Sequence, residues 1–357
     1  KSLGPCIEHV RTRTEGLAEG SICYTNDILN PENTKYNLKY YINLAKEIEG
    51  AGAHILGVKD MAGLLKPYAA YELISALKSE LNIPIHLHTH DTSSIQSATY
   101  IKAIEAGVDV VDVALGGLSG LTSQPNFNSV VEMMKFQDRA STINIDSLNE
   151  YSNYWEAVRE YYYPFESGLK AGSGEVFKHE IPGGQYSNLK PQARGLGLED
   201  RFHEITQMYS DVNLLFGDIV KVTPSSKVVG DMAQYLVSNN LTIQDVIERG
   251  DTISFPQSVV DLFKGELGQP VGGFPKTLQK LVLKNQEPYT DRPNAHIPAL
   301  DIDTEYKAFK KIFENDLNAN DHTLSPTLNS ICVSLFSIFS SFIKTSSYVR
   351  ILHLVFL

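Results

Sequence analysis

The sequence predicts an α/β fold in which parallel β-strands alternate with helices. Between about residues 21 and 135, four short segments rich in Val, Ile and Leu alternate with four longer segments in which apolar residues recur at helical spacing. Strands of this composition are typical of a parallel sheet that helices cover. Four such units, each of roughly thirty residues, amount to half of a (β/α)8 TIM barrel.

The expected elements follow one another in pairs. The predicted strands are 21–27, 54–60, 85–90 and 108–114, and the predicted helices are 36–50, 67–81, 94–106 and 127–135. After a polar break at 142–149 we expect a helix over 148–163, an aromatic and Gly-rich connector over 164–188, and largely helical chain over 192–263. An α-helical region therefore follows the barrel half.

The composition limits the classes of function. The 357 residues are 42% hydrophobic and 20% charged, which suits one large or two medium globular domains. A net charge of −11 without a basic stripe excludes nucleic acid as a partner. Cys6, Cys23 and Cys332 are far apart and match no zinc spacing, as in proteins of a reducing compartment. The chain begins with Lys in a charged segment and shows no secretory signal, so we expect a non-secreted piece of a longer protein.

Three histidines alternate with other residues at the end of the third predicted strand. The segment reads Pro84-Ile-His-Leu-His-Thr-His-Asp-Thr, and period-two alternation places His86, His88 and His90 on one face. Imidazoles at this spacing can converge on one cation. The alternative is that they are core or loop-bonded histidines.

The other predicted strands also end in polar residues. The carboxyl ends of parallel strands are where chemistry collects in such barrels. The residues at these ends are Thr25, Asn26 and Asp27, Lys59 and Asp60, and a loop from Gly116 and Gly117 through Ser119, Thr122, Ser123 and Gln124. For Asp27 and Asp60 the alternative explanation is loop capping.

Two later segments contain turn residues of interest. Pro182-Gly-Gly predicts a tight turn that another part of the chain can approach closely. Thr223-Pro224 is explained by an N-cap followed by Pro at the first helical position. The same arrangement exposes Thr223, Ser226 and Lys227 around a helix N-terminus, where anions bind. The segment 322–357 lacks Asp and Glu, and its apolar part, 331–343, is too short to span a bilayer.

Taken together, five motifs resemble the carboxyltransferase domain of the pyruvate carboxylases. They are Gly57-Val-Lys-Asp-Met-Ala-Gly-Leu-Leu-Lys-Pro, His86-Leu-His-Thr-His-Asp-Thr-Ser, Leu118-Ser-Gly-Leu-Thr-Ser-Gln-Pro, Pro182-Gly-Gly-Gln-Tyr-Ser-Asn and Val222-Thr-Pro-Ser-Ser-Lys-Val-Val-Gly-Asp, in that order. The resemblance runs from about residue 20 to about residue 291. Oxaloacetate decarboxylase α subunits and transcarboxylases share the barrel and the histidines.

The resemblance implies roles for named residues. It implies a divalent metal such as Zn²⁺ or Mn²⁺ held by a carbamylated Lys59, His88 and His90, with His86 structural. It implies that Thr223 relays a proton between pyruvate and biotin, and that Ser226 and Lys227 help to hold biotin. In the implied reaction CO₂ passes from carboxybiotin to pyruvate and gives oxaloacetate. A biotin carrier domain, an ATP-using biotin carboxylase domain and a homo-oligomer complete the implied enzyme, in the bacterial cytoplasm or the mitochondrial matrix and away from any membrane.

The departures from the family pattern set the remaining expectations. The first four barrel strands, with a further Asp metal ligand and the arginines that grip pyruvate and biotin, are absent from the sequence, so the barrel half is the C-terminal one. We expect half-barrel 1–141, helical region 142–320, and an atypical tail 321–357. The alternatives are an oxaloacetate decarboxylase or transcarboxylase subunit, a metal-dependent lyase or synthase of the hydroxymethylglutaryl-CoA lyase type, and a catalytically incomplete fragment that joins a full-length partner.

Overall fold

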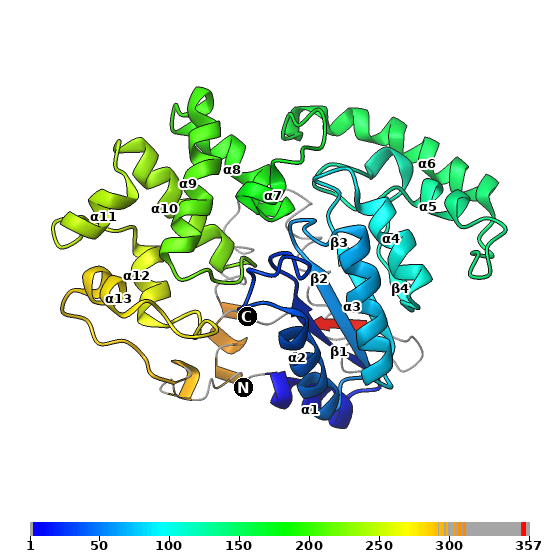
Figure 1. Ribbon diagram of the computed structural model, residues 1–357, viewed down its shortest axis with the longest axis horizontal. Coiled ribbons are helices and arrows are strands. Elements are labelled where there is room, and N and C mark those ends of the chain that lie inside the picture. Colours follow the sequence, from blue (N-terminus) through cyan, green and yellow to red (C-terminus); the bar gives the residue numbers. More distant parts are fainter. Residues whose placement is uncertain are drawn as a thin grey trace. The chain divides into compact units, whose positions relative to one another are not determined.

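The structure, a computed structural model, describes residues 3–291, 293–295, 298, 301, 303–304, 306–308, 310–311 and 351–354. The chain divides into two units, Lys1–Asp291 with Ile351–Leu357, and Arg292–Arg350. In the second unit the described residues include a short 3-10 helix, η4 (Pro293–Ala295). The strands and helices named below belong to the first unit (Figure 1).

A parallel sheet forms the centre of the first unit. Its strands lie in the order β4-β3-β2-β1-β5, and every neighbouring pair is parallel. The strands are β1 (Leu17–Cys23), β2 (Ile55–Asp60), β3 (Ile85–Thr89), β4 (Val110–Val111) and β5 (Ile351–Leu354). Strands β1 to β4 are neighbours in the order of the sequence, which confirms the predicted series of βα units.

Helices connect these strands and supply one side of the core. They are α2 (Leu38–Gly50), α3 (Pro67–Glu80), α4 (Gln96–Glu105) and α5 (Phe127–Met133), with α1 (Leu3–Arg13) before β1. Leu73 and Leu77 of α3 share one fully buried cluster with Leu56, Val58 and Leu87 of the strands. Each side chain of this size contributes about 1.5–3 kcal/mol when buried. The sheet is therefore held from its helix-covered face.

A second core lies among the helices that follow. Tyr209, Phe216, Met232, Leu236 and Phe263 are fully buried in it. Figure 1 labels α6 to α13 along this part of the chain. The elements are η1 (Gly116–Leu118), α6 (Ile145–Arg159), η2 (Glu160–Phe165), α7 (Val176–His179), α8 (Gly183–Gly195), η3 (Glu199–Arg201), α9 (Phe202–Leu215), α10 (Ser225–Ser238), α11 (Ile243–Arg249), α12 (Gln257–Lys264) and α13 (Lys276–Leu283). The predicted helical region is confirmed.

Some predicted boundaries are wrong. The first strand begins at Leu17 instead of residue 21, because Glu19, which looks like a loop residue, is fully buried inside the strand. The fourth strand contains two residues instead of seven, since the Ala114 backbone bonds to Pro125 and Phe127 in its own loop. The connector 164–188 contains α7 and the start of α8, whose first residues are glycines of low helix propensity.

The described residues include two of the three cysteines and the helices that could be tested for membrane spans. Cys6 and Cys23 are free thiols, and burial raises the pKa of Cys23 to about 11 against the opposing effect of Lys59. Among the described residues, no helix is long and apolar enough to cross a membrane. Cys332 and the apolar segment 331–343 lie outside the described residues.

The buried His179 generates a prediction about stability and pH. Burial lowers its pKa from 6.5 to about 4, and its Nδ1 accepts a hydrogen bond from the Ile181 N–H at 3.0 Å. Between these two pH values the unfolded chain binds a proton at His179 that the folded chain does not bind. The neutral His179 therefore contributes fully to the free energy of unfolding above pH 6.5, and this contribution is lost as the pH falls toward 4. We expect His179→Asn, which keeps an acceptor, to remove on the order of 3 kcal/mol of this pH dependence.

Urea unfolding gives the free energy of unfolding at pH 7.5 and at pH 4.5. The change between the two pH values should be smaller in His179→Asn than in the unmodified protein. His203→Asn, at an exposed position, is the matched control and should follow the unmodified chain. Equal pH dependence in His179→Asn and His203→Asn would contradict the prediction.

Candidate functional site

The predicted alternation of β3 is confirmed. Ile85, Leu87 and Thr89 are fully buried, whereas His86 and His88 are half-buried and face the other side of the sheet. His90 follows the last strand residue and is also half-buried. The strand thus directs its apolar side chains into the helix-covered core and its imidazoles to the opposite face.

Hydrogen bonds fix which ring nitrogen of His88 and His90 carries a proton. His88 Nδ1 lies 2.7 Å from Asp112 Oδ2, and His90 Nδ1 lies 2.6 Å from the Thr122 carbonyl oxygen. Carbonyl and ionised carboxylate oxygens only accept hydrogen bonds, so both Nδ1 atoms are donors. Each neutral ring therefore presents a bare Nε2, which is the form that binds metals.

The two Nε2 atoms are directed at each other and lie 3.3 Å apart. Two lone pairs facing at this distance repel unless a proton or a metal cation lies between them. Two nitrogens each about 2.05 Å from a tetrahedral ion are separated by about 3.3 Å, so the pair fits a metal of the zinc type. In the part of the chain that the structure describes, no three His, Cys, Asp or Glu side chains form a metal-binding group. A site here needs a ligand of another kind.

Lys59 is the residue that the strand register brings to the histidines. It pairs with His88 across β2 and β3, and its positive charge acts on His90. Burial, with smaller effects of His88 and Lys59, lowers the pKa of His90 to about 4 against the hydrogen bond to Thr122. His90 is therefore neutral near pH 7, as a ligand must be.

His86 lies between two carboxylates. Its Nδ1 lies 3.0 Å from Glu19 Oε2 and its Nε2 lies 2.9 Å from Asp112 Oδ1. Burial alone would lower the pKa of His86, but Asp112 and Glu19 raise it to about 10. Burial alone would raise the pKa of Asp112, but His86 and His88 hold it well below its ordinary range. Sequence reasoning missed Glu19 and Asp112, although the alternation of residue types along strand 108–114 could have indicated Asp112.

Asp27 and Asp60 have structural roles, as the alternative explanation predicted. Asp60 is fully buried and accepts hydrogen bonds from the Leu64 and Leu65 N–H groups and from Thr89 Oγ1. Asp27 accepts from the Leu29 N–H and pairs with Lys66 at 2.7 Å. Both carboxylates organise the loops that leave the strand ends.

The helical region is held against these same strand ends. The Gly183 N–H donates to the Met61 carbonyl oxygen at 2.8 Å, two residues beyond Lys59. Met61, Cys23 and Val222 form a small buried apolar cluster. The residue before Thr223 thus packs on the end of β1 and on the residue that follows β2, the strand that carries Lys59.

The segment after Val222 differs from the sequence interpretation in its helix start. Helix α10 begins at Ser225, and Pro224 occupies the N-cap position, so Thr223 does not cap the helix and the predicted capping role is wrong. Thr223 is exposed. The expected exposure of Ser226 is wrong, because its side chain is buried in the first turn of α10. Lys227 is exposed, as expected, and pairs with Asp231 at 2.7 Å. Because the Thr223 hydroxyl does not cap α10, it is available to other partners.

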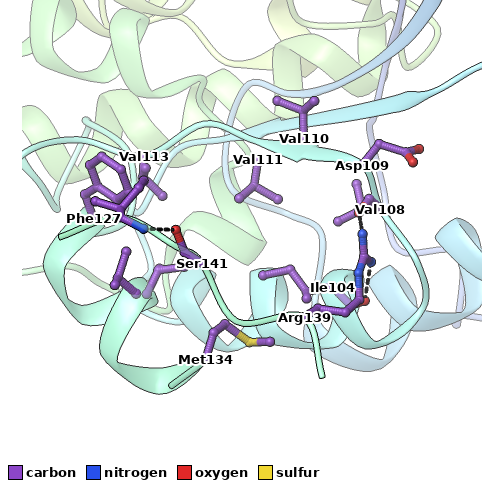
Figure 2. A pocket seen from close by; sticks show the side chains of 13 residues that line it. Ile104, Val108, Asp109, Val110, Val111, Val113, Phe127, Met134, Arg139 and Ser141 are labelled. Atoms are coloured by element: carbon purple, nitrogen blue, oxygen red, sulfur yellow. Dashed lines mark hydrogen bonds between the residues drawn. The ribbon is translucent and has the colours of Figure 1, made fainter. Parts of the chain in front are cut away.

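A separate apolar hollow lies beside β4 (Figure 2). It has a volume of about 390 Å³, and Arg139, which lines it, donates to the Ile104 and Val108 carbonyl oxygens at 2.7 Å each. Its lining includes Ile104, Asp109, Val111, Phe127, Met134 and Arg139. None of the site residues lines it.

Comparisons with known proteins give the family to which the chain is similar. Residues 4–154 match the HMGL-like family and residues 176–334 match the conserved carboxylase domain. The chain is 52% identical to the pyruvate carboxylase of Bacillus subtilis over 347 residues, which is 97% of this chain and 29% of that protein. Identity is 56% to the pyruvate carboxylase of Staphylococcus aureus and 43% to the mitochondrial pyruvate carboxylase of Homo sapiens, over 80% of this chain and 25% of each relative.

Solved structures extend the likeness to the fold. The carboxyl transferase domain of Rhizobium etli pyruvate carboxylase is 53% identical, with a TM-score of 0.85 over 87% of this chain and 52% of that chain. The same domain has been solved with pyruvate and with pyruvate and biocytin. The chain spans less than a third of the length of the curated relatives.

The close approach of Gly183 to His90 generates a prediction. A Cβ atom on Gly183 would lie 2.8 Å from His90 Nδ1, whereas one on Gly184 would meet nothing within 4 Å. We expect Gly183→Ala to displace the imidazole and to lower the free energy of unfolding by about 1–3 kcal/mol. Gly184→Ala, one residue along the same helix, should be neutral or raise it by up to about 1 kcal/mol. Chemical denaturation of both variants is the measurement, and equal losses would exclude the steric explanation.

Proposed function

This chain belongs to the family of pyruvate carboxylase carboxyltransferase domains, and we propose that it carries the half-reaction in which CO₂ passes from carboxybiotin to pyruvate. The observation that carries the proposal is the pair of bare imidazole nitrogens, 3.3 Å apart, beside Lys59. The helical region adds Thr223 to the same strand ends through Val222 and Met61. The match of residues 176–334 to the conserved carboxylase domain favours a carboxylase over a lyase or synthase of the HMGL-like group.

The proposed metal ligands are Lys59, His88 and His90. An amine that has combined with CO₂ becomes a carbamate, whose oxygen is a carboxylate-like ligand, so Lys59 can supply the donor that the two histidines lack. A divalent cation bound there supplies Lewis-acid polarisation of a carbonyl oxygen and stabilises negative charge. The bare Nε2 atoms of His88 and His90 support this assignment.

Thr223 is the proposed proton carrier. A hydroxyl of ordinary acidity is a poor base by itself, so Thr223 must take a proton from the pyruvate methyl group while it gives its own proton to the biotin nitrogen that has lost CO₂. The resulting enolate carbon then forms the new bond to CO₂ and gives oxaloacetate. The exposed position of Thr223 and the absence of a capping bond support this role.

Ser226 and Lys227 are proposed to help hold biotin. Both lie in the first turn of α10, directly after Thr223. We further propose that a biotin carrier domain and an ATP-using biotin carboxylase domain deliver the carboxybiotin, in a homo-oligomer of the bacterial cytoplasm or the mitochondrial matrix. Bacterial and mitochondrial pyruvate carboxylases among the relatives support both compartments.

Metal content tests the ligand assignment. The chain loaded with Zn²⁺ in bicarbonate buffer should retain about one equivalent, and Lys59→Ala should lose it because the carbamate cannot form. Lys280→Ala, at an exposed position of α13, is the matched control and should keep the metal. Elemental analysis after gel filtration measures the result. Equal metal in Lys59→Ala and Lys280→Ala would contradict the carbamate.

A chimera tests the reaction. Replacing the matching segment of Bacillus subtilis pyruvate carboxylase by this chain should give an enzyme that forms oxaloacetate from pyruvate, bicarbonate and ATP. Thr223→Ala in the chimera should lower kcat by about 10²-fold or more, because proton transfer by a positioned group contributes that much. Thr223→Ser keeps the hydroxyl and should keep most of the rate. Unchanged turnover in Thr223→Ala would contradict the proton-carrier role.

A further inference from the structure

A continuous polar chain crosses the sheet from β1 to the histidine site. Glu19 on β1 contacts His86 on β3 at 3.0 Å, His86 contacts Asp112 at 2.9 Å, and Asp112 contacts His88 at 2.7 Å. Glu19 is fully buried, and the His86 side chain is 13% exposed. Buried carboxylates are retained only where partners compensate their desolvation. This series of polar contacts therefore begins at the buried Glu19 and ends at His88, the proposed metal ligand.

A glycine on the strand between them permits the first contact. Gly57 pairs with Ser21 of β1 and with His86 of β3. A Cβ atom on Gly57 would lie 2.5 Å from Glu19 Oε1. Because this position has no side chain, the Glu19 carboxylate reaches across β2 to the His86 ring.

The two oxygens of Asp112 are divided between two imidazoles. Oδ1 faces His86 Nε2 and Oδ2 accepts from His88 Nδ1. A carboxylate that is hydrogen-bonded through Oδ2 and ion-paired through Oδ1 has little freedom to rotate, so the His88 ring that it binds is also fixed in orientation and tautomer. A single carboxylate–histidine contact would leave that rotation free.

We propose that Glu19, His86 and Asp112 are positioning residues that hold His88 in the Nδ1-protonated tautomer with Nε2 directed at the metal position. His86 is then more than a structural histidine one layer below the site. This inference rests on the proposed metal-binding function of His88 and His90. Partners that fix a ligating histidine typically change metal affinity by 10–100-fold when they are removed.

Two variants and a control separate positioning from general stability. Asp112→Asn keeps the size of the side chain, but its single oxygen cannot accept from both histidines. His86→Gln removes the second anchor of Asp112. His54→Gln is the control, because His54 is half-buried directly before β2 and its ring accepts one described hydrogen bond, from the Ala18 N–H at 2.9 Å.

Nitrogen-15 NMR of the metal-free chain, labelled at histidine, measures the His88 tautomer directly. We expect the Nδ1-protonated form in the unmodified chain and in His54→Gln, and a shift toward the Nε2-protonated form in Asp112→Asn. Zn²⁺ titration against a competing chelator should show a 10–100-fold loss of affinity in Asp112→Asn. His86→Gln should lose less affinity by itself and nothing further when combined with Asp112→Asn, since its effect passes through Asp112.

The outcomes distinguish this inference from the proposed function. If the unmodified protein binds no Zn²⁺ but Asp112→Asn changes the His88 tautomer, the metal assignment is contradicted and the positioning role of Asp112 is supported. If the unmodified protein binds Zn²⁺ and neither the affinity nor the His88 tautomer changes in Asp112→Asn and His86→Gln, the positioning role alone is overturned. Additive losses in the double variant would also overturn it, because two independent structural defects add.

Discussion

The period-two alternation of β3 is the constraint on which the rest of the site depends. A strand between two parallel neighbours has no freedom to turn, so one residue of slip would exchange its two faces. Ile85, Leu87 and Thr89 are fully buried on the helix-covered side, and that burial fixes the register. The imidazoles are thereby forced onto the other face, opposite the residues that β2 presents there, including Lys59. The position of the site is a consequence of how the core packs.

Two glycines, Gly57 and Gly183, are the second condition for this site. Gly57 leaves room for Glu19 to reach His86, and Gly183 leaves room for the His90 ring. In both places a methyl group would occupy the space of a polar contact instead of open solvent. The imidazoles are therefore fixed from the sheet on one side and from the helical region on the other, without a large side chain at either contact.

The sequence allowed the strand series, the helical region and the histidine face to be predicted, because these follow from local periodicity. It did not allow the partners of the histidines to be predicted, since Glu19 and Asp112 meet His86 and His88 only through the parallel pairing of strands that are distant in the sequence. Thr223 was misassigned as a cap because a Thr-Pro pair is a good local signal. In the structure Pro224 is the N-cap residue and Val222 packs with Met61, a residue distant in the sequence that no local rule contains.

One ion pair between a buried lysine and a half-buried glutamate connects the two segments that the helical region contributes. Lys221 is 2% exposed and its Nζ lies 2.6 Å from Glu180 Oε2. Replacing a buried ion pair by apolar residues often costs little, whereas removing one partner costs about 3–5 kcal/mol, so such a pair adds little net stability. What it adds is a specific link. Glu180 lies three residues before Gly183, which packs on His90, and Lys221 lies two residues before Thr223. A shift of either segment would separate the buried Lys221 ammonium from Glu180, its nearer carboxylate, so the start of α8 at His90 and the segment that carries Thr223 are held in one fixed relation.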